Sequence, residues 1–381
     1  MPTPSNPTTP PTRSGRYARS ALRRRRRLAL VAAPLLALAV AGTAIGAGVG
    51  SSPRSGAAAG AAVPSAPVTI RLGYLPNLTD ATAIVGVHDH AFADHLPPGD
   101  TLQPSTFNAG PAEVTALLSG ALDAAYLGPS SAVTAFVQSG GKGVRIVSGA
   151  TVGGAALVVA PSITAPSQLE GRTIATPQLG NTQDVALRTW LTAQHLTFPG
   201  PDGGRGRVTI LPEDNATTLA SFKAGMIAGA WVPEPWVARL IGEAGGRVLV
   251  DERSLWPDGR FSTTVLVVNG AFLSGHPDLV TDLLRGQVAT DTFLTTSPAR
   301  ARSDAAAALT SLTGRPLRAT ELAAAWSDLS FTDDPVASSI ATDVRHARSV
   351  GFPSGPIAGL YDLQPLNAIL AASGASPVAP S

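Results

Sequence analysis

From Val68 onward, hydrophobic and polar positions follow two alternating patterns. Short runs of β-type residues occupy residues 68–73, 124–127, 144–147, 156–159, 173–175, 208–211, 228–232, 248–250 and 264–268. Between these runs apolar residues recur at helical spacing, as they do after Gly110 and Pro111, which are expected to cap and begin a helix. From Phe272 the chain is expected to be mostly helical. Short strands alternating with helices predict an α/β fold with mainly parallel sheets.

The same pattern contains a weak internal repeat. Residues 75–80 (LPNLTD) align with residues 179–184 (LGNTQD), and residues 119–126 (SGALDAAY) align with residues 224–231 (AGMIAGAW), at offsets of 104 and 105. Two similar lobes would produce both matches, and chance similarity between two βα units is the alternative. If the repeat is real, Asn77 is equivalent to Asn181 and Tyr126 to Trp231. Because ligands bind at the carboxyl ends of strands, these four residues would then surround one cleft.

The first 67 residues carry the positive charge of the chain. They contain nine Arg and no acidic residue, so the remaining chain has 19 basic and 26 acidic residues, although the whole protein is +2. The apolar run at 28–49 follows five consecutive Arg, which is the plan of an export signal or of an uncleaved membrane anchor. A nucleic-acid-binding arm beside a buried helix is the alternative. Residues 51–67 are rich in Ala, Gly, Ser and Pro, which predicts a flexible tether.

Composition and missing motifs exclude several classes of chemistry. The chain has no Cys, which excludes disulfides, a Cys nucleophile, Cys metal sites and a lipid-anchored lipoprotein. It contains neither a GxSxG elbow nor a GxxxxGK[ST] loop. His88 and His90 form the one local His cluster, and we expect them in a helix, where side chains two residues apart diverge. The sequence therefore predicts no metal, no cofactor and no enzymatic activity.

Turn residues suited to binding an anion follow several of the expected strands. Gly180, Asn181, Thr182 and Gln183 come after a strand and open a helix, where free backbone N–H groups and the helix dipole favour an anion. Similar donors stand at residues 128–131 (GPSS), at Gly154 and at Thr263. Ordinary caps and turns are the alternative interpretation of each. Several of these turns fall together at the carboxyl ends of strands, which favours a binding site for a small anionic solute.

The densest motif is WVPEPW at residues 231–236. Its two Pro residues restrict the backbone around Glu234. Trp231 could line one side of the cleft, and Glu234 could bind a ligand amine or brace a hinge. Alternatively both Trp residues belong to the core and Glu234 is a favourable charge at a helix N-terminus. We expect Trp236 in the core.

Residues 68–351 resemble the substrate-binding proteins of ABC importers, most closely the aliphatic sulfonate, taurine and nitrate group. The motifs that carry the resemblance are LGYLP (72–76), FNAGP (107–111), LSGALD (118–123), YLGP (126–129), TPQLGNTQD (176–184) and WVPEP (231–235). The absence of Cys departs from the usual pattern of Gram-positive relatives, most of which carry a lipobox Cys. That departure concerns surface attachment and leaves the expected fold unchanged.

The resemblance implies a periplasmic-binding-protein-like fold, in which two α/β lobes joined by two crossover strands close around a solute. The implied divisions are a signal or anchor (1–50), a tether (51–67), a first lobe (68–156 and 265–373), a second lobe (157–264) and a tail (374–381). The implied ligand-binding residues are Tyr74, Asn77, Ser130, Gly154, Gly180, Asn181, Thr182, Gln183, Trp231, Glu234 and Thr263. An exported monomer that delivers its solute to a membrane permease and an ATPase is the expected function.

An aliphatic sulfonate is the expected solute, with nitrate, taurine or another small anion as alternatives. A second class is an exported or thiamin-precursor-related enzyme on the same fold, with Glu234 as base. A third is a sensor or adhesion module that works without a transporter.

Overall fold

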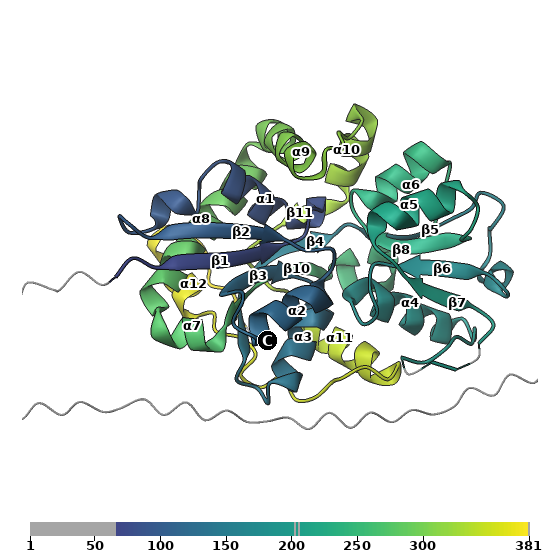
Figure 1. Ribbon diagram of the computed structural model, residues 1–381, viewed down its shortest axis with the longest axis horizontal. Helices are drawn as coiled ribbons and strands as arrows, with labels where there is room; N and C mark the ends of the chain where they lie inside the picture. The colour runs from purple at the N-terminus through teal and green to yellow at the C-terminus, as the bar shows by residue number, and fades with distance from the viewer. Residues whose placement is uncertain (1–65, 202, 205, 380–381) are drawn as a thin grey trace, which may run out of the picture. The chain divides into compact units, whose positions relative to one another are not determined.

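The computed structural model describes residues 66–201, 203–204 and 206–379 (Figure 1). The expected signal or anchor at 1–50, and nearly all of the tether at 51–67, lie outside these ranges. Within them, no helix combines the length and the apolar character needed to cross a membrane.

The first sheet has six strands in the order β11-β4-β10-β3-β1-β2. Their bounds are β1 Thr69–Tyr74, β2 Thr101–Thr106, β3 Ala124–Leu127, β4 Val144–Gly153, β10 Ser262–Asn269 and β11 Leu329–Phe331. Strand β1 pairs in parallel with β2 and β3, while β10 lies antiparallel to both β3 and β4. The short strand β11 adds an antiparallel edge next to β4.

The second sheet has five strands in the order β7-β6-β8-β5-β9. Their bounds are β5 Ala155–Val159, β6 Thr173–Thr176, β7 Thr209–Pro212, β8 Gly229–Pro233 and β9 Arg247–Asp251. Strand β6 pairs in parallel with β7 and β8, and β5 lies antiparallel to β8 and β9.

The two sheets share one strand arrangement, which is what the internal repeat predicts. The order β2-β1-β3-β10-β4 in the first corresponds to β7-β6-β8-β5-β9 in the second, with the antiparallel strand in the same place. That strand is the one by which the chain enters each sheet after crossing from the other. Both crossings are short: β4 leads into β5 through Gly154, and residues 260–261 lead into β10.

Helices cover both faces of the two sheets (Figure 1). Their bounds are α1 Ala81–His88, α2 Gly110–Leu118, α3 Pro129–Gln138, α4 Thr182–Ala193, α5 Asn215–Lys223, α6 Trp236–Ala244, α7 Gly270–Gly275, α8 Pro277–Thr296, α9 Pro298–Thr313, α10 Ala319–Ser327, α11 Ala337–Ser349 and α12 Gln364–Ala372, with 3-10 turns η1 Leu78–Asp80, η2 Ala93–His95, η3 Pro166–Leu169, η4 Glu252–Leu255 and η5 Pro257–Gly259. Helix α11 packs against both α3 and α4, and α10 packs against α6.

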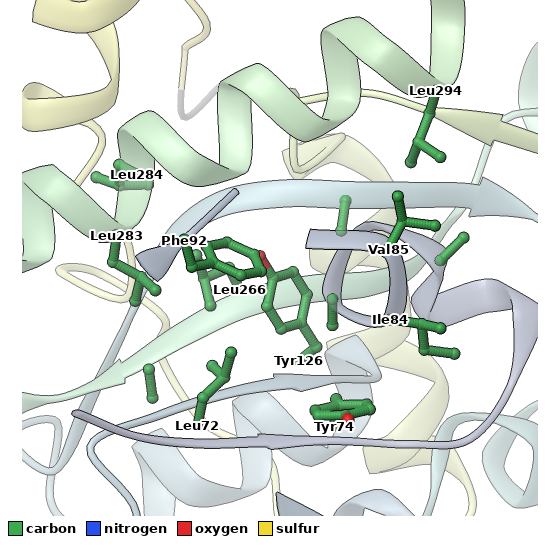
Figure 2. Close-up of a cluster of buried hydrophobic side chains, with 14 of the residues drawn as sticks. Leu72, Tyr74, Ile84, Val85, Phe92, Tyr126, Leu266, Leu283, Leu284 and Leu294 are labelled. Carbon is green, nitrogen blue, oxygen red and sulfur yellow. The ribbon is translucent and has the colours of Figure 1, made fainter. Parts of the chain in front are cut away.

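The core follows the period-two alternation of the strands. In β3, Tyr126 belongs to the cluster on one face of the sheet and Leu127 to the cluster on the other. Figure 2 shows the first cluster, in which Leu72 and Tyr126 of the sheet face Leu284 of α8. Each sheet is thus buried on both faces, as expected for an α/β layer.

Three local expectations need correction. Strand β2 was not expected, because its sequence TLQPST is polar and its residues are largely exposed at the sheet edge. Gly110 is the first residue of α2, and Ala109 precedes it as the N-cap. His88 ends α1, and His90 lies beyond it with a φ of 62°, so the two do not share a helix.

Among the described residues, no group of three or more His, Cys, Asp or Glu is arranged to hold a metal.

Candidate functional site

A small cavity lies between the two sheets, where the carboxyl ends of their central strands meet. Leu75 follows β1, Gly128 follows β3, Pro177 follows β6, and Pro233 ends β8, and all four line the cavity. The other lining residues are Asn77, Thr79, Asp80, Asn108, Ala109, Gly110, Ser131, Asn181, Thr182, Gln183, Asn215, Thr263 and Thr264. The space open to the centre of a water molecule is about 20 Å³. A cavity of that size holds about one water molecule, so the two sheets are close together in this structure.

Gly128 permits this close approach. It follows β3 of the first sheet, and a Cβ added to it would collide with Oγ1 of Thr182, at the start of α4 beside the second sheet. Any larger residue at this position would therefore push the two halves of the site apart.

Several helices begin at the cavity. Gly110 opens α2, Ser131 is in the first turn of α3, Thr182 opens α4 and Asn215 opens α5. The first N–H groups of a helix have no partner within the helix, and its dipole makes this end positive. The N-termini of four helices, from the layers of both sheets, therefore contribute partial positive charge to the lining of one cavity, which suits a small anion.

Buried polar atoms without partners reinforce this interpretation. Among the described residues, no group hydrogen-bonds to the hydroxyl of Ser131, to the hydroxyl of Thr182 or to Oδ1 of Asn215, although all three atoms are buried. Buried polar groups in folded proteins nearly always have a partner. The residues that carry these three atoms line the cavity, so a molecule inside it is a candidate for the missing hydrogen bonds.

Three of the cavity residues also hold the local structure. Asn181 caps α4, with Oδ1 accepting a hydrogen bond from the backbone N of Asp184 at 3.0 Å. Its Nδ2 donates to Oε1 of Gln183 at 2.8 Å, which leaves the amide nitrogen of Gln183 available. Thr263 donates its hydroxyl hydrogen bond to the backbone oxygen of Gly153 at the crossover. Capping thus accounts for part of their role, as the alternative interpretation of these turns predicts.

Asn77 connects the two halves of the site. Its Oδ1 accepts a hydrogen bond of 2.8 Å from the indole N–H of Trp236, which opens α6 after β8. Asn77 follows β1, so this bond joins the first sheet's layer to the second. Trp236 is 8% exposed and packs in the core of the second sheet, as the sequence predicts.

The structure places five of the sequence-predicted residues at the cavity: Asn77, Asn181, Thr182, Gln183 and Thr263. Gly180 lies just outside, in an adjoining groove of about 350 Å³, and its backbone N donates to Oδ2 of Asp184 at 2.9 Å. Ser130 is buried with an unpartnered hydroxyl but does not line the cavity. Its neighbour Ser131 lines it in its place.

Two predicted aromatic residues lie in the core instead. Trp231 is fully buried and packs edge-on against Trp190, with ring centroids 6.2 Å apart. Its indole N–H donates to Oε2 of Glu252 at 2.7 Å. Tyr74 is buried in the cluster shown in Figure 2. The expectation that Trp231 walls the cleft is wrong, because the register of β8 turns its side chain to the α4 face of the sheet.

Glu234 and Gly154 lie together at the crossover and line a second cavity of about 40 Å³. The backbone N of Glu234 donates to the oxygen of Gly154 at 2.8 Å, and its own oxygen accepts from the backbone N of Leu78 at 3.1 Å. Its side chain accepts a hydrogen bond from the N of Ala238 in α6 at 3.1 Å. Burial raises the pKa of Glu234 to about 8. This residue braces the crossover, as one of its three sequence-based alternatives predicts. It bonds the first turn of α6 as a largely protonated group at neutral pH, which differs from the alternative of a favourable charge.

Six polar residues that line the cavity are outside the ligand-binding set expected from the sequence, namely Thr79, Asp80, Asn108, Ser131, Asn215 and Thr264. Two of them carry a signal in the sequence. Asp80 matches Asp184 in the internal repeat, and Asn108 belongs to the FNAGP motif. Asp80 is also the one ionisable side chain among the described lining residues, which include no Lys, Arg or His.

Comparisons with known proteins agree with this architecture. A family model described as the NMT1-like family matches residues 64–310. The taurine-binding periplasmic protein of Escherichia coli (strain K12) is 30% identical to this chain over 201 residues. That match covers 52% of this chain and 58% of the relative, so the chain spans less than two thirds of the relative's length.

Two solved structures show the same fold. The alkanesulfonate-binding protein from Xanthomonas axonopodis pv. citri, bound to MOPS, has a TM-score of 0.61 at 18% identity, covering 75% of this chain and 93% of that one. The periplasmic nitrate-binding protein from Synechocystis PCC 6803 has a TM-score of 0.65 at 14% identity, covering 83% and 92%. At these identities the likeness concerns the fold alone. It confirms the expected periplasmic-binding-protein-like α/β architecture.

Proposed function

Since the chain belongs to the NMT1-like family, we propose that it is the extracytoplasmic solute receptor of an ABC importer. The solute is a small anion, and an aliphatic sulfonate is the favoured one. One observation carries the proposal: four helix N-termini and three unpartnered buried polar atoms converge on one cavity between two sheets. Nitrate is the alternative solute, and a receptor of this kind delivers its solute to a permease coupled to an ATPase.

Short-range donors fit this role better than a cationic site would. The described lining residues include no basic side chain, and the chain beyond residue 67 carries more acidic than basic residues. Long-range attraction therefore does not concentrate anions at the cleft. Backbone N–H groups, hydroxyls and amides act only at contact distance, so they can select a solute by the number and direction of its oxygens.

Binding requires a motion of the two sheets. The present space of about 20 Å³ is smaller than any sulfonate, so the cleft must widen before a solute enters. Both crossovers are short, and Gly153 and Gly154 next to one of them have φ values of 81° and 74°. A hinge at these segments would let the sheets separate and close again as rigid layers.

The chemistry of the cavity favours binding over catalysis. No Ser–His or Cys–His arrangement stands at the cavity among the described residues, and the side chains there are mostly amides and hydroxyls. Homologous proteins are named as binding proteins. The exported location, with the 28–49 segment as signal or anchor, is part of the same proposal.

Isothermal titration of the protein from residue 66 onward, in a sulfonate-free buffer, tests the solute class. The panel comprises alkanesulfonates, taurine, nitrate and bicarbonate. Binding of sulfonates with micromolar or tighter affinity supports the proposal. A folded protein that binds none of the panel overturns it.

A pair of neighbouring serines provides a matched control. Ser131→Ala removes a hydroxyl from the cavity, and Ser130→Ala removes one that is equally buried but outside it. We expect Ser131→Ala to weaken sulfonate binding by about 1–3 kcal/mol, the cost of losing a buried hydrogen bond to a charged group. Ser130→Ala should leave the affinity within about twofold. Equal effects of both substitutions would place the anion elsewhere.

A further inference from the structure

Asp80 is an unusual residue to find in a cleft built for anions. It lines the cavity, is fully buried, and is the one carboxyl among the described lining residues. We propose that Asp80 binds a protonated amine of the solute, so that the solute is a zwitterion such as an amino-substituted sulfonate. This inference rests on the proposed function and names the class of solute that the same cleft selects.

The carboxyl group is positioned by the backbone around it. Asp80 stands at the N-cap of α1, with Oδ1 accepting from the backbone N of Leu75 at 3.3 Å. Oδ2 accepts from the hydroxyl of Thr79 at 3.1 Å. A carboxylate can accept about four hydrogen bonds, so both oxygens retain capacity for a donor from the cavity.

The repeat supplies an internal comparison. Asp184 is the equivalent residue beside the second sheet, also fully buried, and it likewise accepts a hydrogen bond from the turn, at the N of Gly180. Asp184 has a cation, because Nε of Arg188 donates to its Oδ2 at 2.9 Å from one helical turn away. The residue one turn after Asp80 is Ile84, whose side chain carries no charge and cannot pair with the carboxyl group. Of two equivalent carboxyls, one is neutralised by the protein, and the one at the cavity is not.

Among the described residues, the titratable groups around Asp80 are acids, and no basic side chain lies beside it. The titratable groups that face it are Tyr74 from β1, Glu113 from α2 and Tyr126 from β3. None of these can supply a positive charge. Burial raises the pKa of Asp80 to about 8, which means that the carboxyl holds a proton at neutral pH until a cation arrives.

A protonated amine in the cleft would change the protonation state of Asp80. An opposite charge within hydrogen-bonding distance favours the ionised carboxylate, so binding would expel the proton from Asp80. The anionic end of the same molecule would contact the helix N-termini and the hydroxyls of Ser131 and Thr182. The rival arrangement is a protonated Asp80 that donates its own hydrogen bond to an anion oxygen. In that case the proton is retained or taken up.

Two probes that differ by the terminal amine separate these cases. Taurine carries the amine, and ethanesulfonate lacks it. Each is titrated into the protein near pH 7, in two sulfonate-free buffers of different ionisation enthalpy, which measures the protons exchanged on binding. We expect taurine to bind about ten to a hundred times more tightly, as for a hydrogen-bonded charge pair, and to release close to one proton. Ethanesulfonate should release none.

Variants locate the effect at Asp80. Asp80→Asn keeps the shape and an oxygen that can accept from the backbone N of Leu75, and it should reduce the preference for taurine to about twofold or less and abolish proton release. Glu252→Gln is the matched control, because Glu252 is fully buried, has a pKa raised to about 7 by burial, and lies away from the cavity. It should leave the preference and the proton release unchanged.

The outcomes are distinct. Equal binding of the two probes by the wild-type protein overturns the role of Asp80 and leaves the proposed anion receptor standing. Proton uptake with ethanesulfonate supports the rival arrangement and also overturns the role of Asp80 as the binding site of an amine. If neither probe binds to the folded protein, the proposed function fails, and the inference fails with it. If Asp80→Asn does not fold, the proton count of the wild-type protein still decides.

Discussion

The hydrogen bond from Trp236 to Asn77 offers a direct test of how the cleft closes. The substitution Trp236→Phe removes one N–H group and retains an aromatic ring in the core and above the guanidinium of Arg239, 5.3 Å from the ring centroid. The bond joins layers that belong to different sheets. It can therefore form only when those layers are close together.

The expected magnitude follows from the two ends of this bond. A hydrogen bond contributes about 0.5–1.5 kcal/mol, and a buried acceptor left without a partner costs about 1–3 kcal/mol. Asn77 lines the cavity, so water can reach its Oδ1 when the cleft is open, and the loss falls on the closed form alone. We therefore expect the closed form to lose about 1–2 kcal/mol, which weakens solute binding about 5- to 30-fold.

The matched control is Trp231→Phe. It also removes an indole hydrogen bond, at 2.7 Å to Glu252, but both partners belong to the layers of the second sheet. This variant should lower the melting temperature and leave the affinity within about twofold. The assay is isothermal titration with the tightest solute of the panel, together with thermal unfolding of each variant. If Trp236→Phe binds as tightly as the wild type, the bond does not stabilise the closed form.

The remaining predictions concern pH, the crossover and the motion. Burial raises the pKa of Glu234 to about 8, so the folded state loses stability as pH rises toward 8, by up to about 1.4 kcal/mol per pH unit. Glu234→Gln should flatten the fall of melting temperature between pH 5 and 8. An unaltered slope would contradict this. Gly154→Ala should destabilise the protein by more than about 1 kcal/mol, because its φ is 74° and a Cβ would collide with Leu329. The control Gly171→Ala has a φ of 72° and open space around the added Cβ, so it should cost less stability. Chemical denaturation of both variants measures the difference, and equal losses of stability would exclude the collision. Small-angle scattering should show compaction at saturating solute if the crossovers act as a hinge, and an unchanged radius of gyration would count against that motion.

Much of the site was predictable because it depends on local chemistry. Asn181 caps α4 and Thr182 opens it, as the order of strand, Gly turn and polar helix start predicts. The repeat at an offset near 104 residues predicted two similar lobes, and the matching strand orders agree with it. These features are encoded in neighbouring residues, where spacing alone determines which groups meet.

Other parts depended on contacts between distant segments. Ser130 and Ser131 are adjacent in one helix, and the sequence alone cannot tell which of them faces the cleft, since their side chains diverge by roughly 100°. The WVPEPW motif made Trp231 a candidate for the cleft, but the pairing of β8 with β5 buries its side chain against Trp190. The polar strand β2 carries no hydrophobic signal and forms because β1 offers it an edge.

By itself, the sequence determined the α/β class, the order of most elements, the charge separation between the first 67 residues and the rest, and the absence of Cys chemistry. The tertiary structure alone decided which polar residues line the cavity and which charged groups lie beside them. Asp80 and Asp184 show the physical reason. Both are carboxyls near a helix N-terminus in matching motifs. Only the three-dimensional packing reveals that Arg188 neutralises Asp184, while Asp80 lines the cavity with no cationic partner among the described residues.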